Sequence, residues 1–336
     1  MTELFDPDAA AEEGSGLFGL PHSAEEARVH VIPIPFDATT SYRSGASRGP
    51  EAVREASLQV DLFDLEYGRP YEIGIHALET DARFVEWNAA AHECVAAARE
   101  AEDDEAALEK VNDICARVDE LAREKALAVL EAGKLPVGLG GDHATAFGVI
   151  AACVEKHPGL GVLQFDAHAD LRIAYEGFER SHASIMNNVL CNFDVQKLVQ
   201  VGIRDLGQSE ANAIRDSGGL IHTVFDRDWA RAKLARQDLT ALVNEALAEL
   251  PNEIYVSFDV DGLDPALCPN TGTPVPGGLG WHEALLWLDA LAGAGKRVVG
   301  MDLCEVNPGQ DGADSIDSIV GARLLYRMIA AATRES

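Results

Sequence analysis

The sequence predicts a three-layer α/β fold, in which a mainly parallel sheet lies between two layers of helices. Short apolar runs recur along the chain, and the segments between them repeat their apolar residues at helical spacing. This alternation is typical of parallel strands joined by helical crossovers. The 336 residues, 47% of them hydrophobic, are enough for one large buried core. No internal repeat or low-complexity linker divides the chain, which favours a single domain.

The N-terminal part predicts a transition from an acidic segment to the folded domain. Residues 1–25 are acidic and small, and we expect them to form a tail or loose cap. The domain then covers 26–336, and its first strand is expected at 30–36, HVIPIPF. A loop rich in Gly, Ser and Thr follows at 37–50, and Pro50 stands where a helix would begin.

Beyond this loop, helices and strands alternate. Strands are predicted at 135–140, 161–166, 197–203, 220–225, 253–260 and 297–306. Helices are predicted at 102–134 (one long helix or a broken pair), 144–156, 182–192, 209–216, 230–250, 281–293 and 316–333. In sheets of this kind, ligands bind at the carboxyl ends of the strands. The residues that directly follow each strand are therefore the first place to look for chemistry.

Composition excludes several classes of partner. With 56 acidic and 27 basic side chains, the net charge of -29 would repel a nucleic acid and attract a cationic substrate. Solubility, as in a salt-adapted protein, is the favoured explanation of this charge. No apolar stretch approaches the roughly 18 residues of a membrane span, and the acidic start does not resemble a signal peptide. We expect a cytoplasmic protein with no membrane partner. The six scattered cysteines predict buried free thiols.

Polar residues follow three of the predicted strands. The first cluster, GLGGDHATAFG, places Asp142 and His143 after a glycine pair that permits a sharp turn. The second, FDAHAD, spaces Asp166, His168 and Asp170 by two, so that they share one face of an extended chain. Two carboxylates and an imidazole on one face repel and desolvate one another unless a cation holds them. This cluster indicates a metal, whereas His143 alone also fits a loop histidine satisfied by the backbone.

The third cluster, SFDVDGLDP, repeats the arrangement. Asp259 and Asp261 lie two apart at a strand end, whereas Asp264 precedes a proline and fits a turn or cap. The candidate ligands are His143, Asp166, His168, Asp170, Asp259 and Asp261. Their four carboxylates would balance two divalent cations. Oxygen-rich ligation with imidazole and without thiolate fits two Mn²⁺ ions, with Ni²⁺, Co²⁺ or Fe²⁺ as alternatives, and disfavours a structural zinc.

GGDH, DAHAD and SFDVDGLDP, in this order, resemble the three signature motifs of the arginase, agmatinase and formimidoylglutamase superfamily. The resemblance extends to SYRSGASRGPEAVREAS, to PNTGTPVPGGL at 269–279 and to EVNP at 305–308, and covers most of the chain. It implies an arginase-like three-layer αβα fold, a binuclear Mn²⁺ centre, and a homotrimer or homohexamer. It also implies hydrolysis of a guanidino C–N bond with release of urea, by attack of a metal-bridging hydroxide on the guanidino carbon.

The resemblance carries over residue by residue. The six candidate ligands match the family's metal ligands, and Asp170 also matches the carboxylate that orients the hydroxide. His182, in SHASIM, resembles the histidine that shuttles a proton to the leaving amine, although it could also be a helix-start residue without a catalytic role. Glu305 matches the glutamate that pairs with the guanidinium, and its structural alternative is a capping carboxylate.

The substrate is less clearly indicated. Arg172 and Gly207 stand where an arginase would be expected to hold the α-amino acid end of arginine, which makes arginine an improbable substrate. Arg172 resembles an arginine of formimidoylglutamases that could pair with a substrate carboxylate, but it could equally salt-bridge Glu176 or Glu179. The loop TGTPVPGG and His182 are closer to agmatinases, so an agmatinase-like activity is favoured. A formimidoylglutamase and a hydrolase of guanidino acids or guanidine are the alternatives.

Two other classes share the fold. A single-zinc deacetylase would need one metal and does not account for six ligands. An inactive relative that serves as a binding or assembly module would be expected to have lost at least one ligand. All six candidates are present in the sequence, which favours the binuclear hydrolase.

Overall fold

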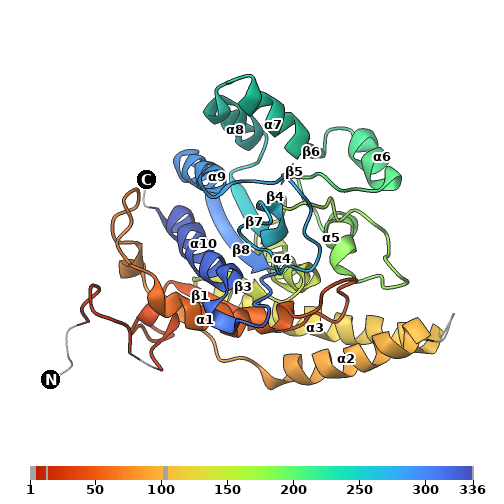
Figure 1. Cartoon of the computed structure of the whole chain (residues 1–336), viewed down its shortest axis with the longest axis horizontal. Helices are drawn as coiled ribbons and strands as arrows, with labels where there is room; N and C mark the ends of the chain where they lie inside the picture. Colours follow the sequence, from red (N-terminus) through yellow and green to blue (C-terminus); the bar gives the residue numbers. More distant parts are fainter. Residues whose placement is uncertain (1–4, 13, 101–104, 335–336) are drawn as a thin grey trace.

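The computed structural model describes residues 5–12, 14–100 and 105–334. Its centre is one sheet of eight strands, all neighbours of which pair in parallel, in the order β2-β1-β3-β8-β7-β4-β5-β6. The strands are β1 Val29–Ile34, β2 Ile75–Ala77, β3 Leu135–Gly140, β4 Gly161–Phe165, β5 Lys197–Val201, β6 Ile221–Val224, β7 Glu253–Asp259 and β8 Arg297–Cys304. The predicted parallel α/β architecture is confirmed (Figure 1).

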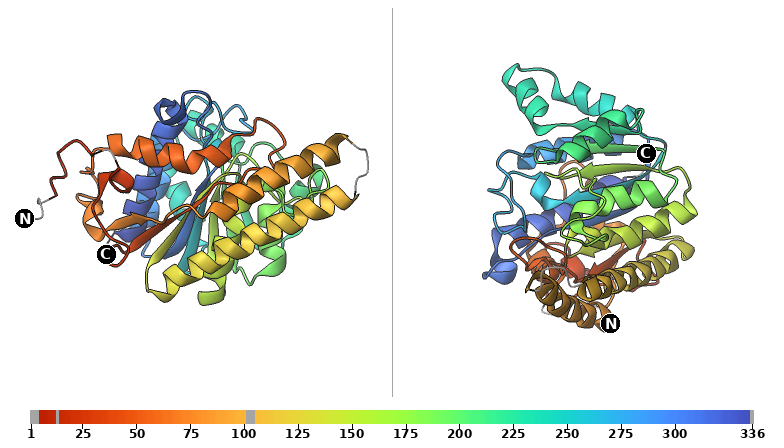
Figure 2. Two further views of the ribbon diagram at one scale, coloured as in Figure 1. Left: turned by 90° about the horizontal axis from the view of Figure 1, so that it is seen from below. Right: turned by 90° about the vertical axis from the view of Figure 1, so that its right-hand side faces the viewer.

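Helices cover both faces of the sheet, as the two side views in Figure 2 show. One layer contains α1 (Gly49–Ala56), α7 (Asp226–Leu234), α8 (Leu239–Ala248), α9 (Trp281–Gly293) and α10 (Ile316–Thr333). The other contains α2 (Ala82–Glu100), α3 (Glu105–Glu131), α4 (Ala146–Lys156), α5 (Ile185–Asn192) and α6 (Gln208–Asp216). Three layers follow from strands that are apolar on both sides, because each face must be covered.

Each strand contributes alternate side chains to the two hydrophobic cores. On β7, Ile254, Val256 and Phe258 pack beneath the α9 and α10 layer, whereas Tyr255 packs beneath the α3 and α4 layer. Successive strand residues point to opposite faces, so one apolar run supplies both cores. Phe258 stacks on Phe165 of the neighbouring strand with ring centroids 4.6 Å apart. This packing fixes the ends of β4 and β7, where the polar clusters begin.

The N-terminal segment packs against the domain. Leu17, Phe18 and Leu20 are buried in the core beneath α10, and the Phe18 ring lies 4.9 Å from that of Tyr326. The backbone N–H of Phe18 donates to the Ser57 hydroxyl at 2.8 Å. Residues 5–12 and most of 21–26 remain at or near the surface. The boundary near residue 25 therefore lies within a segment that shares the domain core.

Several elements differ from the sequence prediction. The helix expected at 230–250 is two helices, α7 and α8, because the chain reverses at Arg236, which has φ 55°, and Asp238 then caps α8. The expected helix at 102–134 is the single helix α3; residues 102–104 lie outside the described part. Neither α2 nor the short β2 was predicted. Four cysteines are buried as expected, whereas Cys94 is half-buried and Cys191 is exposed, and no thiol is in a disulfide.

Sheet order brings the polar clusters together. β3, β8, β7 and β4 are consecutive in the sheet, and their carboxyl ends carry the residues that follow the predicted strands. Residues far apart in the sequence thus meet at one edge of the sheet. No helix in the described residues is long and apolar enough to cross a membrane.

Candidate functional site

Two groups of side chains that could hold a metal ion lie at the carboxyl edge of the sheet. His143, Asp166 and Asp170 form the first group, and Asp166, His168 and Asp261 form the second. His143 begins a short 3-10 turn after β3, Asp166 directly follows β4, and Asp261 lies in the 3-10 turn after β7. Asp166 belongs to both groups. A carboxylate with two oxygens facing two groups is suited to bridge a pair of cations.

Three carboxylates converge on one nitrogen of the first group. His143 Nδ1 lies 3.0 Å from Asp166 Oδ2, 2.9 Å from Asp170 Oδ2 and 3.5 Å from Asp259 Oδ2. Asp170 reaches this point from a backbone with φ 54°, which non-glycine residues rarely adopt. Such strain at a buried carboxylate is typical of a functional position.

The second group is built around His168. Its Nδ1 lies 3.0 Å from Asp261 Oδ2 and 3.6 Å from Asp166 Oδ1. Backbone N–H groups orient the carboxylates, since Asp261 Oδ1 accepts from Ala167 N at 2.9 Å and Asp259 Oδ1 accepts from Asp261 N at 2.8 Å. All six predicted ligands are thus brought together. Donor atoms of this set, oxygen-rich with two imidazoles, fit hard or borderline divalent cations.

Packing the acids together perturbs their protonation. Burial raises the pKa of Asp170 to about 8, with the charge of Asp166 as the next cause. Burial, together with the charges of Asp261 and Asp166, also holds the pKa of Asp259 well above its usual range. The pKa of His168 is raised to about 12 because the carboxylates of Asp261 and Asp166 outweigh the effect of burial. A divalent cation among these oxygens would favour the ionised carboxylates and the neutral imidazoles.

The other nitrogen of His143 meets a polar network beneath the site that the sequence analysis missed. Nε2 lies 2.9 Å from the Ser257 hydroxyl, which donates to Asp302 Oδ1 at 3.1 Å. Because the hydroxyl proton goes to Asp302, the Ser257 oxygen accepts from Nε2–H, which leaves Nδ1 as the nitrogen that would present its lone pair to a cation held among the carboxylates. The signal in the sequence was a serine and an aspartate inside apolar strands, where polar residues are seldom buried without a partner.

Glu305 follows β8 and lies inside the site. Its backbone has φ 64°, and its side chain is buried. Oε1 accepts from His143 N at 3.1 Å, whereas Oε2 has no hydrogen-bond partner among the described residues. Burial and the charges of Asp142 and Asp261 raise the pKa of this carboxyl well above its ordinary value. A buried carboxylate with one free oxygen is suited to accept from a cationic N–H group.

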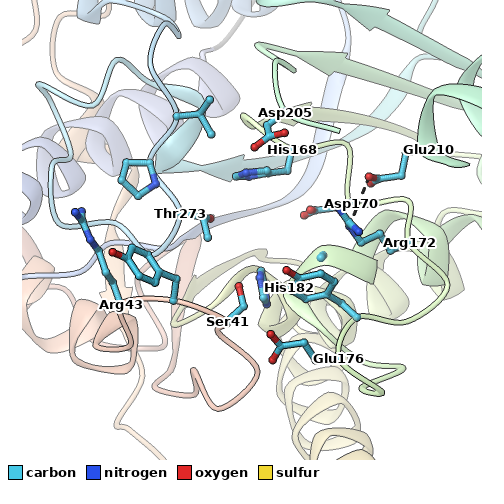
Figure 3. A pocket seen from close by; sticks show the side chains of 15 residues that line it. Ser41, Arg43, His168, Asp170, Arg172, Glu176, His182, Asp205, Glu210 and Thr273 are labelled. Atoms are coloured by element: carbon cyan, nitrogen blue, oxygen red, sulfur yellow. Dashed lines mark ion pairs between the residues drawn. The ribbon is translucent and has the colours of Figure 1, made fainter. Parts of the chain in front are cut away.

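A pocket of about 500 Å³ opens onto the two groups. Figure 3 shows His168 and Asp170 on its wall, with His182 and Ser41 on the opposite side. The walls are formed by Ser41, Tyr42, Arg43, His168, Asp170, Arg172, Tyr175, Glu176, His182, Ala183, Asp205, Glu210, Thr273, Pro274 and Val275. Residues of the loop TGTPVPGG therefore border the pocket as well as forming turns.

His182 reaches the pocket from a 3-10 turn that Ser181 caps. Its backbone N–H donates to the Thr39 hydroxyl at 3.2 Å, and Thr39 in turn donates through that hydroxyl to Asp142 Oδ2 at 2.7 Å. Asp142 therefore supports the loop before α1, and its side chain belongs to neither metal-ligating group. Burial and the nearby His168 lower the pKa of His182 to about 4, so its ring is neutral at pH 7.

Arg172 has a different partner from either one expected. Its Nε lies 3.6 Å from Glu210 Oε2, and its guanidinium lies over the Tyr175 ring at 4.9 Å. Glu176 is instead paired with Arg99. Glu210 is buried and also accepts from Leu171 N at 3.0 Å and Gly207 N at 2.6 Å. Arg172 is therefore paired with an acid, as the structural alternative expected, but the acid is Glu210 of the start of α6 and not Glu176 or Glu179, because the fold brings α6 beside Arg172.

Comparison with known proteins gives the family of this chain. A model of the arginase family matches residues 27–330. The chain belongs to the arginase family. It is 36% identical over 307 residues to the N(1)-aminopropylagmatine ureohydrolase of Thermus thermophilus, covering 91% of this chain and 90% of that protein. It is 31% identical over 296 residues to the agmatinase of Bacillus anthracis, covering 87% and 88% of the two chains.

A solved structure supports the same fold. The proclavaminate amidino hydrolase from Streptomyces clavuligerus superposes with a TM-score of 0.73 at 24% identity, covering 97% of this chain and 99% of that one. The predicted arginase-like α/β architecture is therefore confirmed. Membership of the family also confirms the predicted resemblance and the prediction of a hydrolase of the ureohydrolase class.

Proposed function

We propose that this chain hydrolyses the guanidino C–N bond of a cationic, agmatine-like substrate and releases urea. The observation that carries the proposal is the meeting of two candidate ligand groups beside one pocket with Glu305, whose Oε1 accepts from His143 N and whose buried Oε2 has no partner among the described residues. The ligand groups provide for a pair of cations, and Glu305 provides an acceptor for the planar guanidinium. The ureohydrolase relatives support the same reaction class.

We assign the six candidate ligands to two divalent cations, with Mn²⁺ favoured and Ni²⁺, Co²⁺ or Fe²⁺ as alternatives. His143, Asp170 and Asp259 would hold one ion and His168 and Asp261 the other, with Asp166 shared. Two such ions supply Lewis acidity and a water activated for attack near neutral pH. Four carboxylates balance their charge.

The remaining groups bind the substrate and move protons. Glu305 Oε2 would accept N–H from the guanidinium and hold its carbon over the ligand groups. Asp170 would accept a hydrogen bond from the attacking water and orient it. His182, neutral at pH 7 because its pKa is lowered to about 4, would accept a proton in the pocket and pass it to the leaving amine.

The charges around the pocket favour a cationic substrate over a carboxylate. Glu210 already offsets the charge of Arg172, and stacking on Tyr175 fixes the guanidinium. Arg172 is therefore a weaker anchor for a substrate carboxylate than an unpaired arginine would be. The exposed carboxylate of Asp205 also lines the pocket and could attract an amine. We therefore place formiminoglutamate and guanidino acids behind agmatine-like amines.

The proposal includes a homotrimeric or homohexameric assembly in the cytoplasm, with no nucleic acid or membrane partner. Family membership supports a repeated assembly, and the net charge of -29 disfavours contact with polyanions. Sedimentation of the purified chain at micromolar concentration would give its assembly state.

The decisive test combines metal content and turnover for Asp166→Ala. Because Asp166 belongs to both groups, we expect its loss to lower the bound metal from two ions per chain to fewer than one and to abolish urea release. Urea and ammonia release would be measured with agmatine, arginine, guanidinobutyrate, guanidinoacetate, guanidine and formiminoglutamate, each with Mn²⁺ and with Ni²⁺. We expect agmatine or an extended agmatine to be turned over fastest.

Asp264→Ala is the matched control. Asp264 lies in the third motif, beyond the candidate ligands Asp259 and Asp261, and is exposed; its carboxylate accepts only from the nearby Ala266 N, at 2.9 Å, among the described residues. This variant should retain both metals and normal turnover. A wild-type content of one ion per chain, or normal turnover in Asp166→Ala, would overturn the assignment.

A further inference from the structure

One face of α2 carries polar side chains toward the pocket. Asn88, His92 and Arg99 are separated by four and seven residues, so they share one side of the helix. Asn88 Nδ2 and His92 Nε2 lie 3.2 and 2.8 Å from Asp37 Oδ1, and Asn88 Oδ1 accepts from Asp37 N at 2.9 Å. Asp37 begins the segment 37–45, here termed the front loop. The helix therefore holds the start of the front loop.

At the far end of this face, Arg99 contacts two separate loops. Its Nη2 donates to the Thr40 carbonyl of the front loop at 3.3 Å. Its Nε and Nη2 both donate to Glu176 Oε2, at 3.2 and 2.7 Å. Glu176 belongs to the segment 171–180, here termed the side loop. One side chain outside the pocket thus joins two loops that line it.

Glu176 is presented by a tight turn. Tyr175 and Phe178 exchange two backbone hydrogen bonds, of 3.1 and 2.9 Å, around Glu176 and Gly177, whose φ values are 52° and 85°. Two consecutive positive φ angles are typical of a type I′ turn. These two hydrogen bonds close the turn, but they do not connect the turn with the front loop. Arg99 supplies that link.

The two loops hold the parts of the pocket that lie away from the ligand groups. The front loop contributes Ser41 and Arg43, and the side loop contributes Arg172 and Glu176, all of which are labelled in Figure 3. The ligand groups themselves are held by strand ends and by backbone hydrogen bonds. Movement of the loops should therefore change how the substrate is held more than how it is cleaved.

We infer that Arg99 is a positioning residue that ties the front loop to the side loop and thereby sets the affinity of the pocket for substrate. Arg99 does not itself line the pocket; its bonds to Glu176 and to the Thr40 carbonyl connect it with the two loops that do. The inference rests on the proposed function in one respect, namely that this pocket is where the substrate binds. The tie between the loops can be measured without any substrate.

The test compares Arg99→Ala and Arg99→Lys with Arg83→Ala by hydrogen–deuterium exchange and by kinetics, on the metal-loaded chain. Arg83 is the matched control, because it also lies on α2 and pairs with an acid, Asp81, at 2.9 Å, and neither residue lines the pocket. In Arg99→Ala we expect hydrogen exchange in both loops to become faster. We also expect KM for the best substrate to rise about fivefold while kcat stays within about twofold. The effect on KM is modest because the ion pair is half-exposed. Arg99→Lys should show smaller rises in exchange and in KM than Arg99→Ala, because lysine keeps the positive charge. It should not reach the wild-type values, because its ammonium cannot bond both loops as the guanidinium does.

The outcomes separate the two proposals. Unchanged exchange in both loops of Arg99→Ala would overturn the tie, and faster exchange with unchanged KM would overturn its role in substrate affinity. Equal effects in Arg83→Ala would reduce Arg99 to a general stabiliser of α2 and would also overturn the inference. A wild-type chain that cleaves no substrate of the panel, but shows the expected exchange pattern, would overturn the proposed function while supporting the tie between the loops.

Discussion

His143 connects the candidate metal ligands with a polar network inside the sheet. Its Nδ1 faces three carboxylates, and its Nε2 faces Ser257, which is held by Asp302 on the adjacent strand in register. A ligand histidine whose second nitrogen donates to a fixed acceptor has its tautomer and ring orientation set in advance. Ser257 and Asp302 would therefore influence a cation held by His143 without contacting that cation.

Replacing Ser257 should weaken metal binding. Ser257→Ala removes the acceptor of His143 Nε2–H and leaves that buried donor unpaired, so we expect the affinity for Mn²⁺ to fall about 10- to 100-fold. Competition with a fluorescent chelator would measure this affinity. The far-ultraviolet circular dichroism should stay unchanged, since serine to alanine is a small change within β7.

Ser184→Ala serves as the control for this truncation. The Ser184 hydroxyl is also buried but has no hydrogen-bond partner among the residues that the structure describes. Its loss should leave Mn²⁺ affinity unchanged. Equal losses in both variants would show that burial of the hydroxyl, and not its bond to His143, matters.

At this scale, the side chains that meet as candidate ligands were predictable from the sequence, but the residues that hold them in place were not. Asp166, His168 and Asp170 were recognisable because spacing by two after an apolar run places them on one face. The supporting roles of Asp302 and Glu210 could not be recognised in the sequence. Asp302 accepts from Ser257 of the neighbouring strand and Glu210 accepts from Leu171 N, and only the fold brings these residues together. The partner of Arg172 was not predictable for the same reason. Glu210, with which it pairs, lies 38 residues away in the sequence, whereas Glu176, which is close to it in the sequence, pairs with Arg99.

At the scale of elements, the order of the strands explains the site. β3, β8, β7 and β4 are neighbours in the sheet, so the four loops that follow these strands begin side by side although they are far apart in the sequence. The strands other than β2 were predictable because they are largely apolar and at least four residues long. The three-residue β2 is too short to show a period, and the many alanines of α2 give it no clear apolar stripe. The break between α7 and α8 depends on a left-handed Arg236, which a helical pattern does not reveal.

The contact of α2 with the front loop should depend on pH. The hydrogen bond to Asp37 raises the pKa of His92 above 6.5. Burial alone would raise the pKa of Asp37, but the bond to His92 and backbone N–H groups lower it to about 2, so Asp37 stays charged near neutral pH. A raised histidine pKa stabilises the fold below pH 6.5, and this contribution is lost as the pH rises through the folded value. Asp142 favours the charged ring and Arg99 opposes it.

His92→Gln tests this contact. Glutamine can still donate to Asp37 but carries no charge, so the free energy of unfolding should fall below that of the wild type most strongly under pH 6.5. The difference should stay under about 1 kcal/mol, because the ring is partly exposed, and should shrink at higher pH. Urea unfolding of both proteins across the pH range would measure it. A difference that grows with pH would contradict the assignment.

At the scale of the whole molecule, charge is the dominant feature. A net charge of -29 on 336 residues opposes compaction, since acidic side chains repel one another across the surface. Ion pairs on the surface, such as Arg123 with Glu120 and Glu155, use some of the 27 basic residues, but 56 acidic residues leave a large excess of negative charge. The same field that would attract a cationic substrate therefore lowers stability at low ionic strength.

Salt should stabilise this protein by screening that repulsion. Raising KCl from about 0.1 M to about 1 M shortens the screening length from about 10 Å to about 3 Å, so we expect the thermal unfolding midpoint at pH 7.5 to rise, most steeply at the low-salt end. The same titration near pH 5, close to the isoelectric point of about 4.6, should give a much smaller rise because the net charge is nearly neutralised. Differential scanning calorimetry of the metal-loaded chain at both pH values would measure the two slopes. Equal slopes would contradict the prediction and would mean that salt acts by being excluded from the protein surface, an effect that does not depend on net charge.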